Sequence, residues 1–223
     1  MLSLKKENNK IYLKKNNNVI SFINDIKYKY AGYYRMICEI PKGTNAKMEI
    51  SNNIKNNPII HDILRGKKRY FQYGNIKWNY GAIPQTIEDL NHTYEETGLK
   101  GDGDPLDIID ISNIKLNIGD IIWVKIIGAI PLIDEGETDW KIIAINKDDP
   151  NINKINDIED LNINIRNDLL DWFINYKKMS KGITNIIGMD NKIQKKYLAL
   201  SVIETCHRLW KKNIKNYKNY KKI

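Results

Sequence analysis

The chain has 223 residues, of which 42% are hydrophobic and 28% are charged, and its formal net charge is +9. This balance is typical of a globular protein with a sizeable core. No run in the sequence approaches the eighteen or so consecutive apolar residues that a membrane helix needs. The positive charge is compatible with an anionic partner, but a composition rich in Lys, Asn and Ile explains it equally well.

The first half of the chain predicts short strands. Residues 1–18 are polar and are expected to be a lead-in that lacks the features of a secretory signal. Residues 19–50 alternate apolar and polar side chains, with two runs that suit strands joined by the turn PKGTNA. Residues 69–86 are aromatic-rich and favour short twisted strands. Dense β-branched runs predict buried strands at 108–112, 121–133 and 140–146.

The second half predicts helices. Residues 157–178 carry a helical apolar period from about residue 165, and residues 197–210 repeat this pattern. Strands followed by helices predict one mainly β domain (α+β) over 1–223, a closed or nearly closed β-barrel with helices packed outside. Residues 213–223 are expected to be a basic tail.

The two cysteines, Cys38 and Cys206, are far apart and lack the spacing of a metal site. We therefore predict two reduced thiols. Together with the missing targeting signals, these thiols favour a cytoplasmic protein that does not bind a membrane.

Carboxylates concentrate near the ends of the predicted strands. The segment GDGDPLD supplies Asp102, Asp104 and Asp107 within six positions. The segment DEGETDWK supplies further acids, namely Asp134, Glu135, Glu137 and Asp139. A third pair, Glu39 and Glu49, brackets the turn IPKGTNAKM. Strand ends joined by glycine-containing loops can converge on one point, as binding residues usually do.

Two interpretations of GDGDPLD are open, a turn and a magnesium site, and a calcium loop is not. Asp, Gly and Pro together are typical of a turn. An EF-hand calcium loop is excluded by spacing, because its sixth and twelfth positions would be Asp107 and Asn113 instead of glycine and glutamate. Magnesium fits the carboxylates, since it is commonly held by one or two of them together with substrate phosphates.

Basic residues accompany these acids. Lys47 lies two positions before Glu49, and Lys141 lies two positions after Asp139, so each pair shares one face of a strand. Such a cavity would offer phosphate oxygens both metal ions and cationic donors. Ordinary surface ion pairs on a sheet are the alternative.

Seven colinear motifs resemble the soluble, magnesium-dependent inorganic pyrophosphatases of the first structural family, in its eukaryotic-type branch. The similarity runs from about residue 33 to 212 and includes DGDPLD, EIPKGTNAKMEI, NPIIHD with GKKRY, NYGAIPQT, LIDEGETDWKIIAI, NDIEDL and WFINYKK. It implies a compact, twisted, OB-like barrel of about five strands with two main helices outside. The implied reaction is hydrolysis of pyrophosphate to two phosphates by a metal-activated water.

The resemblance also implies roles for individual residues. Three to four Mg²⁺ ions are expected, with the metal ligands Asp102, Asp107, Asp134 and Asp139, and with Glu39 and Glu49 in an outer shell. Asp104 matches the general base. The groups that hold the phosphates would be Lys47, Arg69, Tyr176 and Lys177, with Lys141 and Tyr80 lining the pocket. Each tyrosine could instead be an ordinary core aromatic.

The chain departs from the family pattern at three places. Ile76 stands where a tyrosine is common, and either Tyr73 or Tyr70 is a candidate substitute. Gly43 replaces a tryptophan near the usual subunit contact, which puts a homodimer through that surface in question. Residues 181–192 diverge from the loop that usually follows the phosphate-binding lysine.

Two rival functions remain at this stage. An OB-like nucleic-acid module would use the aromatics of FQYGNIKWNYG and the positive charge, although a carboxylate-lined cleft repels a polyanion unless metals are bound. A metal-dependent phosphoesterase or nuclease of broader substrate range is the second. The leading hypothesis has pyrophosphate and phosphate as its ligands and no nucleic acid.

Overall fold

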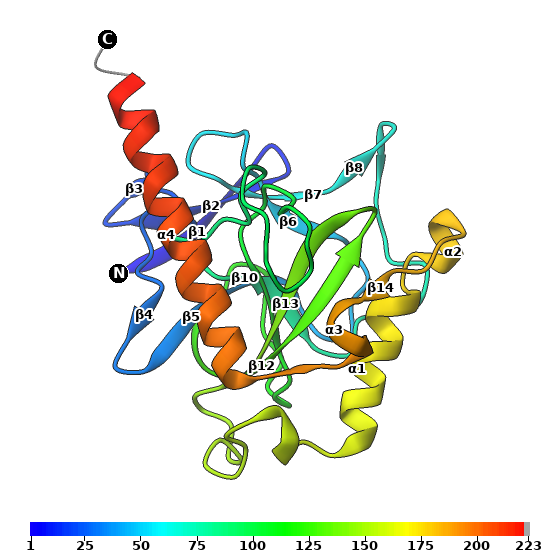
Figure 1. Cartoon of the computed structure of the whole chain (residues 1–223). Coiled ribbons are helices and arrows are strands. Elements are labelled where there is room, and N and C mark those ends of the chain that lie inside the picture. Colours follow the sequence, from blue (N-terminus) through cyan, green and yellow to red (C-terminus); the bar gives the residue numbers. More distant parts are fainter. Residues whose placement is uncertain (221–223) are drawn as a thin grey trace.

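The structure is a computed structural model that describes the backbone of residues 1–220 and the side chains of residues 1–214. Figure 1 shows strands at the centre and two long helices on the outside. These helices are α1 (Ile163–Asn175) and α4 (Lys196–Tyr220). No helix in the described part of the chain is long and apolar enough to cross a membrane.

Five strands form a closed ring of hydrogen-bonded pairs. They are β5 (Tyr33–Ile40), β10 (Asn79–Ala82), β11 (Asp107–Asp110), β13 (Glu137–Asn146) and β12 (Ile121–Asp134). Each strand pairs with the next in this order, and β12 pairs back with β5. All of these pairs are antiparallel except β11 with β13, which is parallel. The ring confirms the expected mainly β chain of about five central strands with two main helices.

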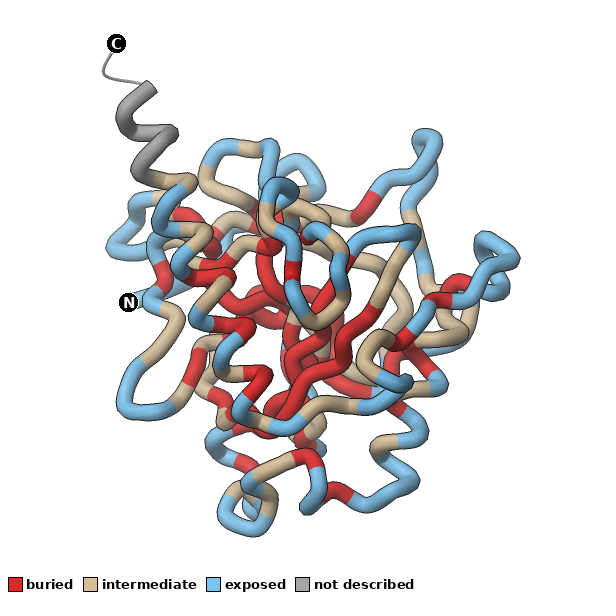
Figure 2. Tube along the Cα trace, in the orientation of Figure 1, coloured by how far each residue is buried: buried red, intermediate tan, exposed pale blue. Residues whose placement is uncertain are grey.

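The ring strands are buried on both faces, which explains their nearly continuous apolar sequences. Along β13, Ile142 and Ala144 belong to the core that α4 completes with Val202. The intervening Ile143 belongs to a second core, which α1 completes with Trp172. Successive side chains on a strand point to opposite faces, so one strand serves both cores. Figure 2 shows the buried residues gathered in these central strands.

A second sheet packs beside the ring. Its strands are β1 (Leu2–Glu7), β2 (Lys10–Lys15), β3 (Asn18–Ile20), β7 (Ile59–His61) and β6 (Met48–Ile50). The expectation of a mere polar lead-in over residues 1–18 was therefore wrong. In β2 the polar side chains alternate with Ile11 and Leu13, which reach a core, and Leu13 is only 1% exposed.

Short elements complete the chain. They are β4 (Lys29–Tyr30), β8 (Ile63–Leu64), β9 (Lys67–Lys68), η1 (Ile158–Asp160), α2 (Lys178–Lys181), β14 (Ile186–Ile187), α3 (Gly188–Asn191) and β15 (Gln194–Lys195). Both β14 and β15 pair with β12, so the divergent segment 181–192 is tied to the ring. Cys38 and Cys206 are buried and form no disulfide, as expected for free thiols.

The strands expected at 108–112, 121–133 and 140–146 are confirmed by β11, β12 and β13, and α4 confirms the last helix. Within the segment 157–178, α1 confirms the helical period expected from about residue 165, and the short η1 precedes it. Asp157 caps η1 through the Ile158 amide, and Asn162 caps α1 through the Asn164 amide. Two capping side chains five residues apart each begin a new element. The expected basic tail continues α4 up to residue 220, and residues 221–223 lie outside the described part.

Gly81 on β10 packs directly against the backbone of β5. A Cβ atom there would lie 1.8 Å from the Ile37 carbonyl oxygen, which is backbone and cannot move aside cheaply. We predict that Gly81→Ala lowers the free energy of unfolding by about 3 kcal/mol or more, because overpacking distorts the strand pair. Urea denaturation measures this change.

Gly98→Ala is the matched control. Gly98 has a left-handed φ of +70°, but its Cβ would meet nothing within 4 Å. Only backbone strain remains there, which costs about 1–2 kcal/mol. If both variants lost the same free energy of unfolding, crowding at Gly81 would not be the cause of its destabilisation.

Candidate active site

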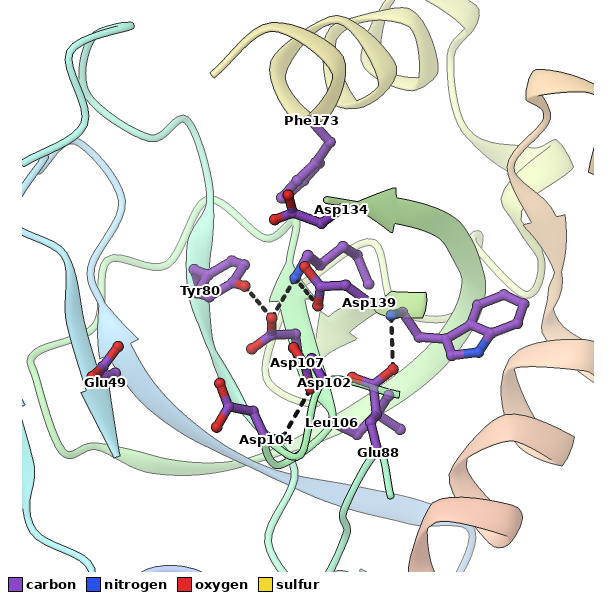
Figure 3. Close-up of polar contacts among 12 residues, drawn as sticks. Glu49, Tyr80, Glu88, Asp102, Asp104, Leu106, Asp107, Asp134, Asp139 and Phe173 are labelled. Atoms are coloured by element: carbon purple, nitrogen blue, oxygen red, sulfur yellow. Dashed lines mark hydrogen bonds and ion pairs between the residues drawn. The ribbon is translucent and has the colours of Figure 1, made fainter. Parts of the chain in front are cut away.

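Strand register brings distant charged residues together at one end of the ring. In the parallel pair β11–β13, Asp107 lies opposite Lys141. Asp139 lies two positions before Lys141 and shares its face. The Lys141 ammonium donates to Asp139 Oδ1 at 2.5 Å and also to Asp107. From the adjacent β10, the Tyr80 hydroxyl donates to Asp107, as Figure 3 shows.

The GDGDPLD loop packs tightly against this end of β13. Gly101 bridges to Thr138, and a Cβ on Gly101 would lie 2.5 Å from the backbone carbonyl of Glu88. The absence of a side chain therefore permits the loop to approach. Asp102 Oδ1 accepts a hydrogen bond from the Asp104 amide at 2.9 Å, which orients both acids within the turn.

A compact acidic cluster results. Glu88, Asp102 and Asp139 each offer a carboxylate oxygen, and these oxygens all lie within 4.8 Å of one another. Figure 3 shows these carboxylates converging, with Asp102 on the loop, Asp139 on β13 and Glu88 on a separate segment. Glu88 Oε1 accepts from the Trp140 amide at 2.9 Å, while its Oε2 is buried without a partner among the described side chains. All-carboxylate oxygen donors suit a hard divalent cation such as Mg²⁺, so the residues present fit such an ion.

Burial and mutual repulsion raise the pKa values of the acids in and beside this cluster. Burial, with the charge of Asp139 next, raises the pKa of Asp102 to about 8. Burial raises the pKa of Asp139 to about 6 against the opposing effect of Lys141, and burial with Asp107 raises that of Asp104 to about 6. Burial also raises the pKa of Glu88 well above its usual range. Additional positive charge would relieve this repulsion.

A second network surrounds Asp62. Asp62 Oδ2 accepts from Lys47 Nζ at 2.7 Å and from Arg69 Nη1 at 2.6 Å. Backbone hydrogen bonds join the same three residues: the amide of Lys47 donates to Arg69, that of Asp62 to Lys47, and that of Arg69 to Asp62. Lys47 Nζ also lies 3.1 Å from Glu49 Oε2. Asp62 thus holds two predicted phosphate-binding side chains.

A third group follows the C-terminal end of α1. The helix ends at Asn175, and the next residues are Tyr176 and Lys177. The Tyr176 hydroxyl donates to Asp134 Oδ2 at 3.2 Å, and the Lys177 ammonium donates to Asp134 Oδ1. The end of α1 therefore places a phenol and a buried ammonium beside the hairpin that joins β12 and β13.

These groups surround a cavity of about 240 Å³. The predicted site residues among its lining are Glu39, Lys47, Glu49, Tyr80, Asp104, Asp107, Lys141 and Tyr176. Glu39 is anchored by the Ile50 amide, which donates to Oε1 at 2.6 Å. Asp102, Asp134 and Asp139 lie outside the lining but bond to residues that belong to it. Arg69 and Lys177 line an adjoining cavity.

The position held by Ile76 is part of the core, where this side chain is 1% exposed. Tyr73 donates its hydroxyl to Asp171 at 2.8 Å and does not line the cavity. Tyr70 is 45% exposed and lines the adjoining cavity. The structure therefore brings neither tyrosine into the place beside Tyr80.

Two residues of this region were missed by the sequence interpretation. Asp62 ends the motif NPIIHD, and Glu88 follows NYGAIPQT after one further residue. Asp62 lies between His61 and Ile63, and Glu88 lies between Ile87 and Asp89. Both acids are at most 8% exposed. A buried acid needs a partner, which is the signal that could have identified them.

The fold and site together define a class of protein, a mainly β chain in which a carboxylate cluster that could hold a metal ion lies beside a cavity lined by both acids and lysines. The family description "Inorganic pyrophosphatase" matches residues 36–211. The human inorganic pyrophosphatase is 41% identical over 212 residues, which cover 92% of this chain and 73% of the human protein.

Solved structures agree with this match. The inorganic pyrophosphatase of Schistosoma japonicum has a TM-score of 0.89 and 38% identity, and the match covers 95% of this chain and 80% of that one. A truncated vacuolar soluble pyrophosphatase of Trypanosoma cruzi, solved in complex with PPi, has a TM-score of 0.88 and 31% identity over 96% of this chain and 91% of that one. The chain belongs to the inorganic pyrophosphatase family and is an inorganic diphosphatase, a hydrolase, as the resemblance to the eukaryotic-type branch predicted.

We predict that Asp62→Asn lowers kcat/KM for pyrophosphate by about 10- to 100-fold, because Lys47 and Arg69 lose the carboxylate that holds them in place. Steady-state phosphate release measures the effect. Asp168→Asn is the control, because Asp168 forms an exposed ion pair with Lys77 at 3.1 Å. A change of less than about twofold in Asp62→Asn would show that Asp62 does not position these cations.

Proposed function

We propose that this chain hydrolyses pyrophosphate to two orthophosphates in a Mg²⁺-dependent reaction inside the cavity between β10, β11 and α1. One observation carries the proposal: carboxylates and cations from separate strands meet at this cavity, with Asp104 and Asp107 on its acidic side and Lys47 and Lys141 beside them. The PPi bound to the Trypanosoma cruzi relative supports the choice of substrate. A divalent metal is implied by the family, and the carboxylate cluster is compatible with it.

The proposed metal ligands are those that the family resemblance implied. Asp102, Asp107 and Asp139 would hold the tightest ion, with Asp107 shared with a second and Asp134 serving a further one, for three to four ions in total. Glu39 and Glu49 would act through water. Glu88 extends this set, because its unpartnered Oε2 lies beside Asp102 and Asp139. Bound Mg²⁺ would supply charge neutralisation and a lowered pKa of bound water.

The basic side chains and Tyr176 would bind the phosphates. Arg69 can hold two phosphate oxygens at once, whereas Lys47, Lys141 and Lys177 act as point charges. Tyr176 adds a hydroxyl donor beside Lys177. These cations stabilise the charge that develops on the leaving phosphate when the bridging P–O bond breaks.

Asp104 is the proposed general base. It lines the cavity and accepts a hydrogen bond from Asn52 Nδ2 at 2.7 Å. As the water oxygen bonds to phosphorus, Asp104 would take its proton. Tyr80 holds the Asp107 carboxylate by donating its hydroxyl to it, which favours a positioning role over that of a passive core aromatic.

The finer biological context remains a proposal. We favour a single-domain cytoplasmic enzyme, although one relative is described as vacuolar and the family therefore does not set the compartment. A nucleic-acid module is disfavoured by the carboxylates that line the cavity. A homodimer is the assembly to test, with Gly43 at the position where the usual contact is in question.

We expect phosphate release from pyrophosphate to require Mg²⁺, to disappear in excess EDTA, and to fall strongly with Ca²⁺, whose larger and more flexible coordination suits the site less well. Colorimetric phosphate assays measure each condition. Parallel assays with a phosphomonoester and with single-stranded DNA test the broader phosphoesterase. No release from pyrophosphate at any Mg²⁺ concentration would refute the proposal.

Two aspartates of β11 allow a matched comparison. Asp110 is fully buried and accepts hydrogen bonds from Asn79, Ser112 and Asn146, away from the cavity. We expect Asp107→Asn to lower kcat/KM by about 100-fold or more with little loss of stability, because it removes a charge from the site. Asp110→Asn should instead cost about 1–3 kcal/mol of stability, because its amide would oppose that of Asn79.

Activity assays on the folded fraction and urea denaturation separate these effects. If Asp107→Asn retained near-normal turnover at ordinary Mg²⁺, its assignment as a metal ligand would be wrong.

A further inference from the structure

The loop between β6 and β7 brings an uncharged polar side chain from the second sheet to the proposed catalytic cavity. Hydrogen bonds close the base of this loop, residues 51–58. The Ser51 amide donates to the Pro58 carbonyl at 2.9 Å, and Asn57 Nδ2 donates to the Ser51 carbonyl at 2.9 Å. The next residue after Ser51 is Asn52, which lines the cavity. The closed loop base therefore sets where Asn52 approaches it.

Asn52 is the hydrogen-bond partner of the proposed general base. Its Nδ2 donates to Asp104 Oδ1 at 2.7 Å and lies 3.4 Å from the Gly103 carbonyl oxygen. Among residues 1–214, the second oxygen of Asp104, Oδ2, accepts no hydrogen bond, and the carboxylate forms no ion pair within 4.0 Å. The two oxygens therefore differ, because Oδ1 is held by an amide and Oδ2 is available to accept a proton.

The backbone of Asp104 is held by other groups. Its amide donates to Asp102 Oδ1 at 2.9 Å, and its carbonyl accepts from the Glu88 amide at 2.9 Å. Figure 3 shows Asp104 at the turn of the loop, beside Asp102. These bonds fix the main chain but leave the carboxylate free to rotate, since the last torsion of an aspartate has a broad range. Only Asn52 restrains that rotation within residues 1–214.

The exposure of this pair indicates what its hydrogen bond can do. Asn52 and Asp104 are both exposed. A hydrogen bond between exposed groups replaces bonds to water, so it adds little to the free energy of unfolding. Orientation is a separate matter, because a general base must lie within hydrogen-bond reach of the water whose proton it takes.

From these contacts we infer that Asn52 is a positioning residue for hydrolysis: its amide holds Asp104 Oδ1 so that Oδ2 faces the attacking water. The inference rests on the proposed function, because Asn52 acts only through the proposed general base. An amide suits this task, since it donates a hydrogen bond without adding a charge that a phosphate could draw away from Asp104.

The test measures kcat and KM for pyrophosphate at saturating Mg²⁺. We expect kcat of Asn52→Ala to fall about tenfold, because a general base is worth about 10²- to 10⁴-fold and a misoriented one retains part of that. KM should change by less than about twofold, and urea denaturation should give nearly the wild-type free energy of unfolding. A raised KM with unchanged kcat would assign Asn52 to substrate binding and overturn the inference.

A conservative variant tests the amide itself. Asn52→Gln keeps the amide donor on a side chain that is longer by one methylene, and it should recover most of the kcat that Asn52→Ala loses. An equal loss of kcat in both variants would show that the reaction does not depend on this donor.

A double variant tests whether Asn52 acts through Asp104. Asp104→Asn removes the base, so adding Asn52→Ala to it should lower kcat by less than about twofold further, because residues that act as one unit are not additive. If the two losses multiplied, Asn52 would act independently of Asp104 and the inference would be wrong.

Asn213→Ala is the matched control. Asn213 Nδ2 donates to Asp89 Oδ2 at 3.0 Å, the same kind of bond, and Asn213 lines neither cavity. Its kcat should equal that of the wild type. An equal loss in the control, or a wild-type kcat in Asn52→Ala, would overturn the inference while hydrolysis by the wild type leaves the proposed function intact. If the wild type released no phosphate from pyrophosphate, both would fail.

Discussion

The parallel pairing of β11 with β13 is the constraint on which the site depends. It places Asp107 directly opposite Lys141, and the pleat places Asp139 on the same face. A shift of this register by one residue would turn Asp107 toward the other face and separate these charges. The pairing closes the five-strand ring as well, so the strands that assemble the core also set the distances within the site.

The carboxylate cluster has an energetic cost that the surrounding fold must offset. Glu88, Asp102 and Asp139 are close together and largely buried, and burial raises their pKa values. Lys141 offsets part of this repulsion. The two apolar cores on either side of the ring supply the stability that allows such a site to persist, since sites of this kind commonly trade stability for activity.

Charge is segregated along the site. The proposed catalytic cavity combines acids with Lys47 and Lys141, and the adjoining cavity that Arg69 and Lys177 line has no acidic residue in its lining. Tyr176 lines both cavities, so the end of α1 lies at the boundary between the cavity that contains acids and the cavity that contains none. Asp62 holds Lys47 and Arg69 in place near this boundary through two ion pairs.

The sequence by itself determined the central strands, both main helices and the family, because side-chain alternation, helical periodicity and motif order are properties of neighbouring residues. It also predicted acids and cations that the structure brings to one cavity, among them Asp104, Asp107 and Lys141. Only the tertiary structure decided that Asp62 joins Lys47 to Arg69, that Glu88 meets Asp102, and that residues 1–18 build a sheet. These contacts join segments far apart in the chain, and their distances depend on strand register and packing, which local patterns do not encode.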